Sequence, residues 1–159
     1  MKMIQSFAAD HDYIVPGIYI SRVDGDITTY DLRTRRPNSD DLMDNATMHS
    51  VEHMLATFLR NSPMADRIIY FGPMGCQTGF YLLVRDADDQ KVLQTLRDCL
   101  EQVLAHQGEV FGASRKQCGN YRNLSLNKAQ IECRRYLDVL SRLTADDMTY
   151  PCMIEEESV

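Results

Sequence analysis

The chain has 159 residues, of which 44% are hydrophobic and 25% are charged, and its formal net charge is −6. These are ordinary globular values, and the length predicts a single domain that spans residues 1–159. An acidic chain without a basic patch is a poor partner for nucleic acid or an anionic membrane surface, so we expect neither. The first residues lack the apolar segment of a secretory signal, and no apolar run reaches the length of a membrane span. We therefore expect a cytoplasmic protein.

The predicted elements mix strands and helices along the chain. Three segments are rich in β-branched and aromatic residues and are expected to form strands: 17–33, 66–71 and 80–86. The first is a β-hairpin, because its two halves flank an Asp-Gly turn. Three segments have the periodicity of amphipathic helices: about 47–61, 88–108 and 125–143. The acidic end, 153–159, is expected to be frayed. This order predicts an α+β fold with helices packed on one face of an antiparallel sheet.

The first predicted helix carries His49, Glu52 and His53 on the side opposite its apolar stripe. At 100° per residue the stripe comprises Met48, Val51, Met54, Leu55, Phe58 and Leu59. Histidines four residues apart lie one turn apart and can reach one cation, and the glutamate can stand beside it as a base. The alternative is a solvated polar face. The glutamate between the histidines favours the metal hypothesis.

Two histidines do not complete a catalytic metal site, which usually takes three protein ligands and leaves one position open. The candidates for the third ligand are the five cysteines, several carboxylates, His11 and His106. Cys99 and Cys133 lie inside predicted helices and are expected to be buried. Cys76 and Cys118 both lie in loops beside glycine, where chemistry tends to be placed. One of these two is predicted to complete a His–His–Cys site and the other to act as an acid/base, and spacing alone leaves both assignments open.

Five blocks in the same order resemble the LuxS family of S-ribosylhomocysteine lyases: SFAADH (6–11), YDLRTRRPN (30–38), HSVEH (49–53), PMGCQTGFYL (73–82) and KQCG (116–119). The HxxEH pattern alone is a weak signal, but the set is specific and covers the chain from end to end. The sequence departs from the family at Tyr70 and Gly72, where an acidic residue and a serine are usual.

The resemblance implies a metal bound by His49, His53 and Cys118, with a water in the fourth position. In the family this metal is usually Fe²⁺, and Zn²⁺ or Co²⁺ are possible replacements, since such donors suit all three ions. The resemblance also implies that Glu52 and Cys76 are the two general acid/base residues.

The resemblance further implies that Ser6, His11 and Arg33 line the substrate pocket, which in the family lies at a homodimer interface and draws on both subunits. The implied reaction moves the carbonyl of ring-opened S-ribosylhomocysteine along the ribose chain and then releases homocysteine by β-elimination. The second product is 4,5-dihydroxy-2,3-pentanedione, the precursor of the quorum-sensing signal autoinducer-2.

Two alternatives compete with the lyase hypothesis. A small metallopeptidase of the inverted HxxEH type would use Glu52 to activate water and would normally take a distal glutamate as its third ligand. A non-enzymatic module with a structural metal would have a closed site, typically of four protein ligands.

Overall fold

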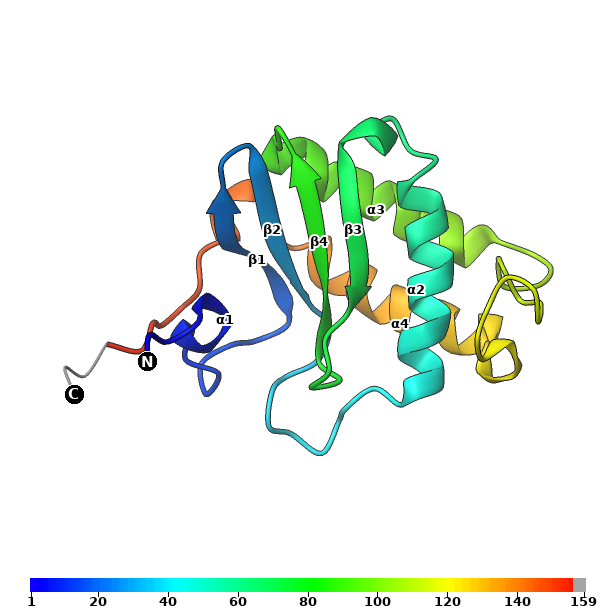
Figure 1. Cartoon of the computed structure of the whole chain (residues 1–159), viewed down its shortest axis with the longest axis horizontal. Helices are drawn as coiled ribbons and strands as arrows, with labels where there is room; N and C mark the ends of the chain where they lie inside the picture. The colour runs from blue at the N-terminus through cyan, green and yellow to red at the C-terminus, as the bar shows by residue number, and fades with distance from the viewer. Residues whose placement is uncertain (156–159) are drawn as a thin grey trace.

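The computed structural model describes residues 1–155 and contains one antiparallel sheet with the strand order β1-β2-β4-β3 (Figure 1). The strands are β1 (Gly17–Asp24), β2 (Ile27–Arg33), β3 (Ile68–Pro73) and β4 (Gly79–Arg85). The expected hairpin forms between β1 and β2, and Gly25 supplies the positive φ of its turn. β3 begins later than expected because residues 65–67 form a 3-10 turn. The predicted antiparallel sheet is confirmed.

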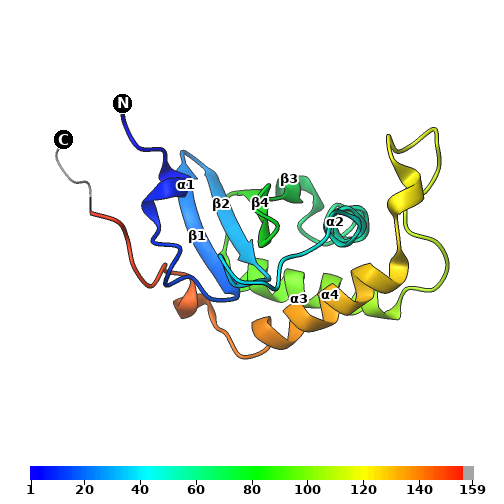
Figure 2. The ribbon, with the colours of Figure 1, turned by 90° about the horizontal axis from the view of Figure 1, so that it is seen from below.

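The helices are α1 (Gln5–Ala8), α2 (Asn45–Leu59), α3 (Asp89–Ala105) and α4 (Leu126–Leu140). Figure 2 shows α2, α3 and α4 on one face of the sheet, as predicted, and the unpredicted four-residue α1 beside β1 on the other. α2 begins two residues before the predicted start at Thr47, because the Asp44 side chain accepts a hydrogen bond from the Thr47 backbone N–H and caps the helix.

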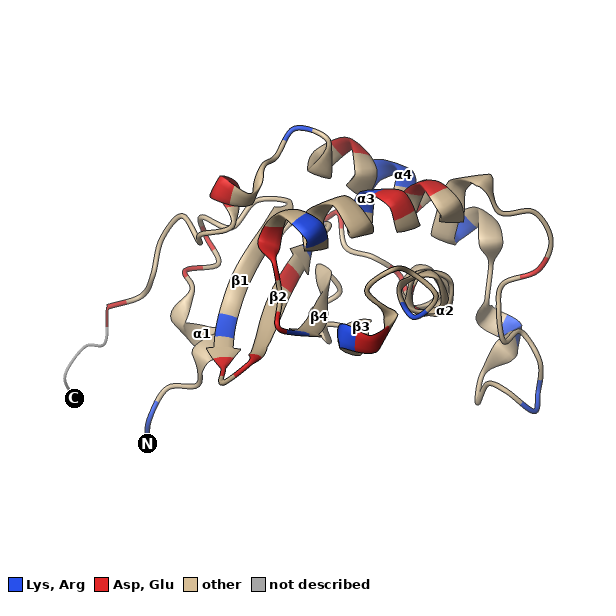
Figure 3. Cartoon of the chain, turned by 90° about the horizontal axis from the view of Figure 1, so that it is seen from above, with Lys and Arg blue, Asp and Glu red and all other residues tan. Residues whose placement is uncertain are grey.

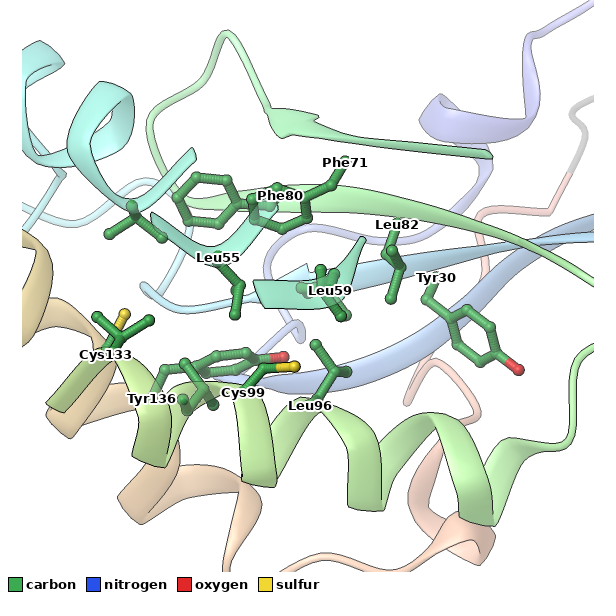
Figure 4. Packing of buried hydrophobic residues seen from close by; sticks show 14 of the residues in the cluster. Tyr30, Leu55, Leu59, Phe71, Phe80, Leu82, Leu96, Cys99, Cys133 and Tyr136 are labelled. Carbon is green, nitrogen blue, oxygen red and sulfur yellow. The ribbon is translucent and has the colours of Figure 1, made fainter. Parts of the chain in front are cut away.

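The core lies between the sheet and the three long helices (Figure 4). Side chains alternate along each strand, so Tyr30 and Leu82 point toward the helices while their neighbours face the other side. Phe71 and Phe80 stack with their ring centroids 5.2 Å apart. Cys99 packs among these residues as expected, and burial raises the pKa of its thiol to about 12. Acidic and basic residues are mixed along α3 and α4 (Figure 3). In residues 1–155, no helix combines the length and apolar character that a membrane span requires.

The C-terminal segment returns to the start of the chain. Met153 pairs with Ala9 in an isolated antiparallel bridge, and the backbone N–H of Ile154 donates to the carbonyl of Ala8 at 2.7 Å. The prediction of a frayed end was therefore wrong for residues 153–154, because their backbone groups find partners in the N-terminal segment. The rest of that prediction, at 156–159, lies outside the described residues.

Candidate metal centre

His49 and His53 project from the side of α2 that faces away from the core. Met48, Val51 and Met54 on the opposite side are buried, whereas both imidazoles are only partly covered. The two rings meet edge to face with centroids 4.6 Å apart, as expected one helical turn apart. The amphipathic pattern of this helix therefore holds both imidazoles beside each other and accessible.

The loop between α3 and α4 brings Cys118 to this pair. Gly112 has a φ of +70°, and a Cβ at this position would lie 3.2 Å from Nδ1 of His53, so the loop approaches the imidazole through a glycine. The backbone N–H of Ser125 donates to Oγ of Ser50 at 2.8 Å, which ties the end of the loop to α2. These contacts place the cysteine over the histidines.

The three side chains form a group in which each offers one ligand atom and all these atoms lie within 4.8 Å of one another. Sγ of Cys118 is 3.3 Å from Nε2 of His49. In a tetrahedral site with ordinary bond lengths, a thiolate sulfur and an imidazole nitrogen lie about 3.6 Å apart, so this spacing fits one divalent ion. The structure therefore brings together the three residues predicted as ligands, and their role in binding a metal stays a prediction.

Glu52 lies on α2 between the two histidines and is half-buried. Among residues 1–155 the group consists of the two histidines and Cys118, and the carboxylate of Glu52 does not belong to it. It is therefore placed beside the centre rather than in it, as a base adjacent to a metal would be. His11 and His106, the other candidate ligands, instead contact the carbonyls of Ala9 and Glu109.

Cys76 lies in the turn between β3 and β4 and is exposed. Its Sγ is 3.0 Å from Oγ1 of Thr78 and 3.9 Å from Nη1 of Arg33. The same guanidinium nitrogen donates to Oγ1 of Thr78 at 2.7 Å. Since that hydroxyl oxygen accepts from Arg33, its own hydrogen is free for the sulfur. An anionic sulfur at this position would face a hydroxyl donor and a positive charge.

A buried ion pair holds the guanidinium of Arg33 beside Cys76. Asp31 is 0% exposed and Arg33 is 2% exposed, and they make two hydrogen bonds of 3.0 and 2.6 Å. Burial opposes the charge of Arg33, but Asp31 outweighs this effect and the pKa of Arg33 is raised. The Tyr150 hydroxyl donates to Oδ2 of Asp31 at 2.6 Å, and its ring stacks on Tyr19 at 4.9 Å. The guanidinium is thus fixed by groups from both β2 and the C-terminal segment.

The remaining predicted substrate residues are Ser6 and His11. Ser6 is part of α1 and lines a cleft of about 520 Å³ on the open face of the sheet, together with Tyr70 and Tyr81. Nδ1 of His11 is 2.9 Å from the carbonyl of Ala9. The structure therefore brings Arg33 to Cys76, and Ser6 lines a cleft whose wall includes Tyr81, the residue paired with Asp31 across the sheet.

Tyr70 and Gly72, the two positions at which the sequence departs from the family pattern, are structurally coupled. A Cβ added at Gly72 would lie 2.1 Å from the hydroxyl oxygen of Tyr70, so the tyrosine ring occupies the space of the missing side chain. Tyr70 is 50% exposed and forms one wall of the cleft beside Ser6. The pair changes the surface of that cleft and leaves the metal group untouched.

Figures 1 and 2 both place α2 between the β3–β4 hairpin and the loop that carries Cys118. Sequence reasoning did not find Asp31, Thr78 and Tyr150, which fix the surroundings of Cys76. Thr78 could have been identified from the sequence, because it lies two residues from Cys76. Asp31 and Tyr150 could not, because they are 119 positions apart in the chain and meet only in the folded structure.

The chain is similar to known proteins over almost its whole length. The family model described as S-Ribosylhomocysteinase (LuxS) matches residues 4–146. A protein of Finegoldia magna named S-ribosylhomocysteine lyase is 41% identical over 156 residues, which is 95% of this chain and 99% of that protein. Proteins with the same name from Clostridium beijerinckii and Phocaeicola vulgatus are also 41% identical, and the matches cover 95% of this chain and 99% and 98% of theirs.

Proposed function

The chain belongs to the LuxS family, and we propose that it is an S-ribosylhomocysteine lyase, a carbon–sulfur lyase that uses a bound metal. The observation that carries this proposal is the His49, His53 and Cys118 group, which lies in a chain that matches the named lyases over 95% of its length. Neither the metallopeptidase nor the structural-metal alternative is favoured. No distal glutamate and no fourth donor belongs to the group in residues 1–155.

His49, His53 and Cys118 would hold one divalent ion and leave a fourth position open. The ion, when bound, acts as a Lewis acid that polarises the substrate carbonyl. We assign Fe²⁺ as the native ion, with Zn²⁺ and Co²⁺ as replacements, on the basis of the family, since a set of two imidazoles and a thiolate accepts all three.

Glu52 and Cys76 would move the protons. Each carbonyl shift removes a proton from one carbon of the ribose chain and returns one to its neighbour, so a base and an acid are needed on opposite faces of the carbon skeleton. With the carbonyl at C3, removal of an adjacent proton breaks the carbon–sulfur bond and releases homocysteine. Arg33 and Thr78 would hold the sulfur of Cys76 in position for these transfers.

The protein would work as a homodimer with shared active sites. In one copy, α2 separates the β3–β4 hairpin from the loop that carries Cys118 (Figure 1), so a second copy is a direct way to bring a Cys76 to a metal group. The open face of the sheet is an apolar candidate interface, since Ile4, Phe7 and Tyr70 are exposed there or next to it. Ser6, His11 and Arg33 would line the resulting pocket.

The product 4,5-dihydroxy-2,3-pentanedione would make this enzyme a source of autoinducer-2 and would link quorum sensing to the methyl cycle. We place the enzyme in the cytoplasm. The five cysteines are free thiols, which is consistent with a reducing compartment.

The proposal is tested by an anaerobic assay of the iron-loaded protein with S-ribosylhomocysteine, in which a thiol reagent follows the release of homocysteine. Glu52→Gln should lower turnover about 10²–10⁴-fold without loss of metal, because only the acid/base group is removed. Glu101→Gln, on an exposed part of α3, is the matched control and should keep full turnover. No release by metal-replete wild type would contradict the proposal.

The same preparation separates the alternatives. Cleavage of a peptide panel without release of homocysteine would favour the metallopeptidase. A protein that unfolds when the metal is chelated and shows no water on the metal in the loaded form would favour the structural module.

A further inference from the structure

The three proposed metal donors are each supported on the side away from the metal. Nδ1 of His53 is 2.7 Å from the carbonyl oxygen of Phe111, and Sγ of Cys118 accepts a hydrogen bond from the backbone N–H of Asn120 at 3.4 Å. Both of these supports come from the backbone. His49 differs, since its Nδ1 is 2.5 Å from Oδ1 of Asn123, a side chain.

The amide of Asn123 is oriented by a second asparagine. Its Nδ2 donates to Oδ1 of Asn45 at 2.6 Å, which leaves Oδ1 for His49. An amide oxygen only accepts hydrogen bonds, so with Asn123 in this orientation it is Nδ1 of His49 that carries the ring proton. The lone pair of Nε2 then points toward Cys118. The opposite orientation of the amide would favour the tautomer with a proton on Nε2, where the metal binds.

The geometry is built from two neighbouring elements. Asn45 and His49 lie one turn apart on the first two turns of α2, and Asn123 ends the short 3-10 turn at 121–123 in the loop that carries Cys118. Asn123 therefore bridges Asn45 and His49 from the opposite side. The same loop supplies the thiolate and the group that orients the imidazole, so one conformation of the loop sets two of the three ligands.

We propose that Asn123, oriented by Asn45, is a positioning residue that selects the Nε2-ligating tautomer of His49 and thereby tightens divalent metal binding. The proposal rests on the metal site of the proposed function and adds two residues outside its ligand set. Partners of this kind fix the tautomer and the ring orientation of metal-bound histidines, and their loss typically costs 10–100-fold in affinity.

The test uses Co²⁺ as the probe, with its visible absorption spectrum and competition by a chelator as readouts on the full-length chain. Asn123→Ala should weaken Co²⁺ binding about 10–100-fold. Asn123→Asp should bind within about threefold of wild type, because a carboxylate accepts the same ring proton. The Co²⁺ affinity of Asn45→Ala should fall between those of the two Asn123 variants, since the amide of Asn123 is then free to rotate. Asn127→Ala, at an exposed position on the first turn of α4, is the matched control and should bind Co²⁺ with the affinity of wild type.

Three outcomes would overturn the proposal. Asn123→Ala could bind Co²⁺ as wild type does, or Asn123→Asp could lose as much affinity as Asn123→Ala, which would assign Asn123 a structural role only. A drop in the urea midpoint of the metal-free Asn123→Ala protein large enough to explain the lost affinity would have the same meaning. Failure of the wild-type protein to take up Co²⁺ would be a different result from these three. It would contradict the metal centre of the proposed function, and the positioning role with it.

Discussion

The metal group and the surroundings of Cys76 are built in opposite ways. His49, His53 and Cys118 are partly covered, and single hydrogen bonds support them from behind. Asp31 and Arg33, which fix the surroundings of Cys76, are buried and make two hydrogen bonds to each other. A bound ion completes the geometry of its own ligands, so those side chains can stay accessible and adjustable.

Cys76 has no ion to hold it, and its orientation must be prepared by the protein. Burying the charges of Asp31 and Arg33 carries a large desolvation penalty that their attraction offsets only when the remaining lone pairs are satisfied. Tyr150 and Thr78 provide those contacts. The contrast suggests that changes in the metal group act mainly on metal affinity, whereas changes around Arg33 act mainly on folding and on the placement of Cys76.

The largest effects are expected when Cys76 and Cys118 are replaced in turn. Cys76→Ala should retain the metal and lose turnover by about 10²–10⁴-fold, the usual contribution of an acid/base group. Cys118→Ala should lose both, because the ion would keep only two protein ligands. Metal content by elemental analysis and homocysteine release are measured on the same samples. Loss of metal in Cys76→Ala but not in Cys118→Ala would reverse the assignment of the two cysteines.

The next largest effect is expected from Arg33→Met, which leaves the carboxylate of Asp31 buried and uncompensated. Breaking a buried pair in this way typically costs about 3–5 kcal/mol of folding free energy, measured here as a change in urea unfolding. The control is Arg85→Met. It breaks the pair with Asp26, whose side chains are 46% and 50% exposed, and should cost about 1 kcal/mol or less. Similar costs for the two variants would show that the Asp31–Arg33 pair contributes no more than a surface pair.

Tyr150→Phe is a milder change in the same region. The stacking on Tyr19 is kept while the hydroxyl that donates to Asp31 is lost, so we expect a cost of about 1.5–3 kcal/mol, typical of a hydrogen bond to a charged group. Burial and the charge of Asp31 raise the pKa of Tyr150, so its hydroxyl remains a donor at neutral pH. Tyr13→Phe, at an exposed position, should leave the urea midpoint unchanged. Equal midpoints for the two variants would contradict the role of the hydroxyl.

Much of the metal group could be predicted from the sequence because its signals are local. The spacing of His49 and His53 on one helix face depends only on helical periodicity. Neighbouring glycines distinguish the two loop cysteines from the other three, but only the family resemblance assigns each of them a role. Gly112 and Asn123 were missed, because an irregular loop has no periodicity from which contacts can be deduced.

The surroundings of Cys76 were harder to predict because they depend on pairing between distant segments. Arg33 reaches Cys76 because it is paired with Gly79 at the start of β4, and that register is set by the whole sheet. Tyr150 reaches Asp31 only because the C-terminal segment turns back on the sheet. The predicted start of α2 is two residues late for a local reason, because the helix is capped by Asp44, ahead of the apolar stripe from which the start is predicted.

The smallest expected effect concerns pH and the helix that carries the metal group. The ammonium of Lys128 and the N–H of Thr47 lower the pKa of Asp44 to about 2. Because the pKa in the folded state is depressed, the carboxylate stabilises the fold above its unfolded-state pKa of about 3.9, and this contribution is lost as the pH falls toward about 2. Asp44 is 56% exposed, so solvent screening keeps the effect below about 1 kcal/mol.

Asp44→Asn isolates this contribution, because asparagine is an equally good N-cap but carries no charge. The difference in urea midpoint between wild type and Asp44→Asn should be present near neutral pH and should shrink as the pH is lowered below about 4. High salt at neutral pH should reduce the same difference, since the pair with Lys128 is exposed. A difference that is independent of both pH and salt would mean that the surface charges do not support α2.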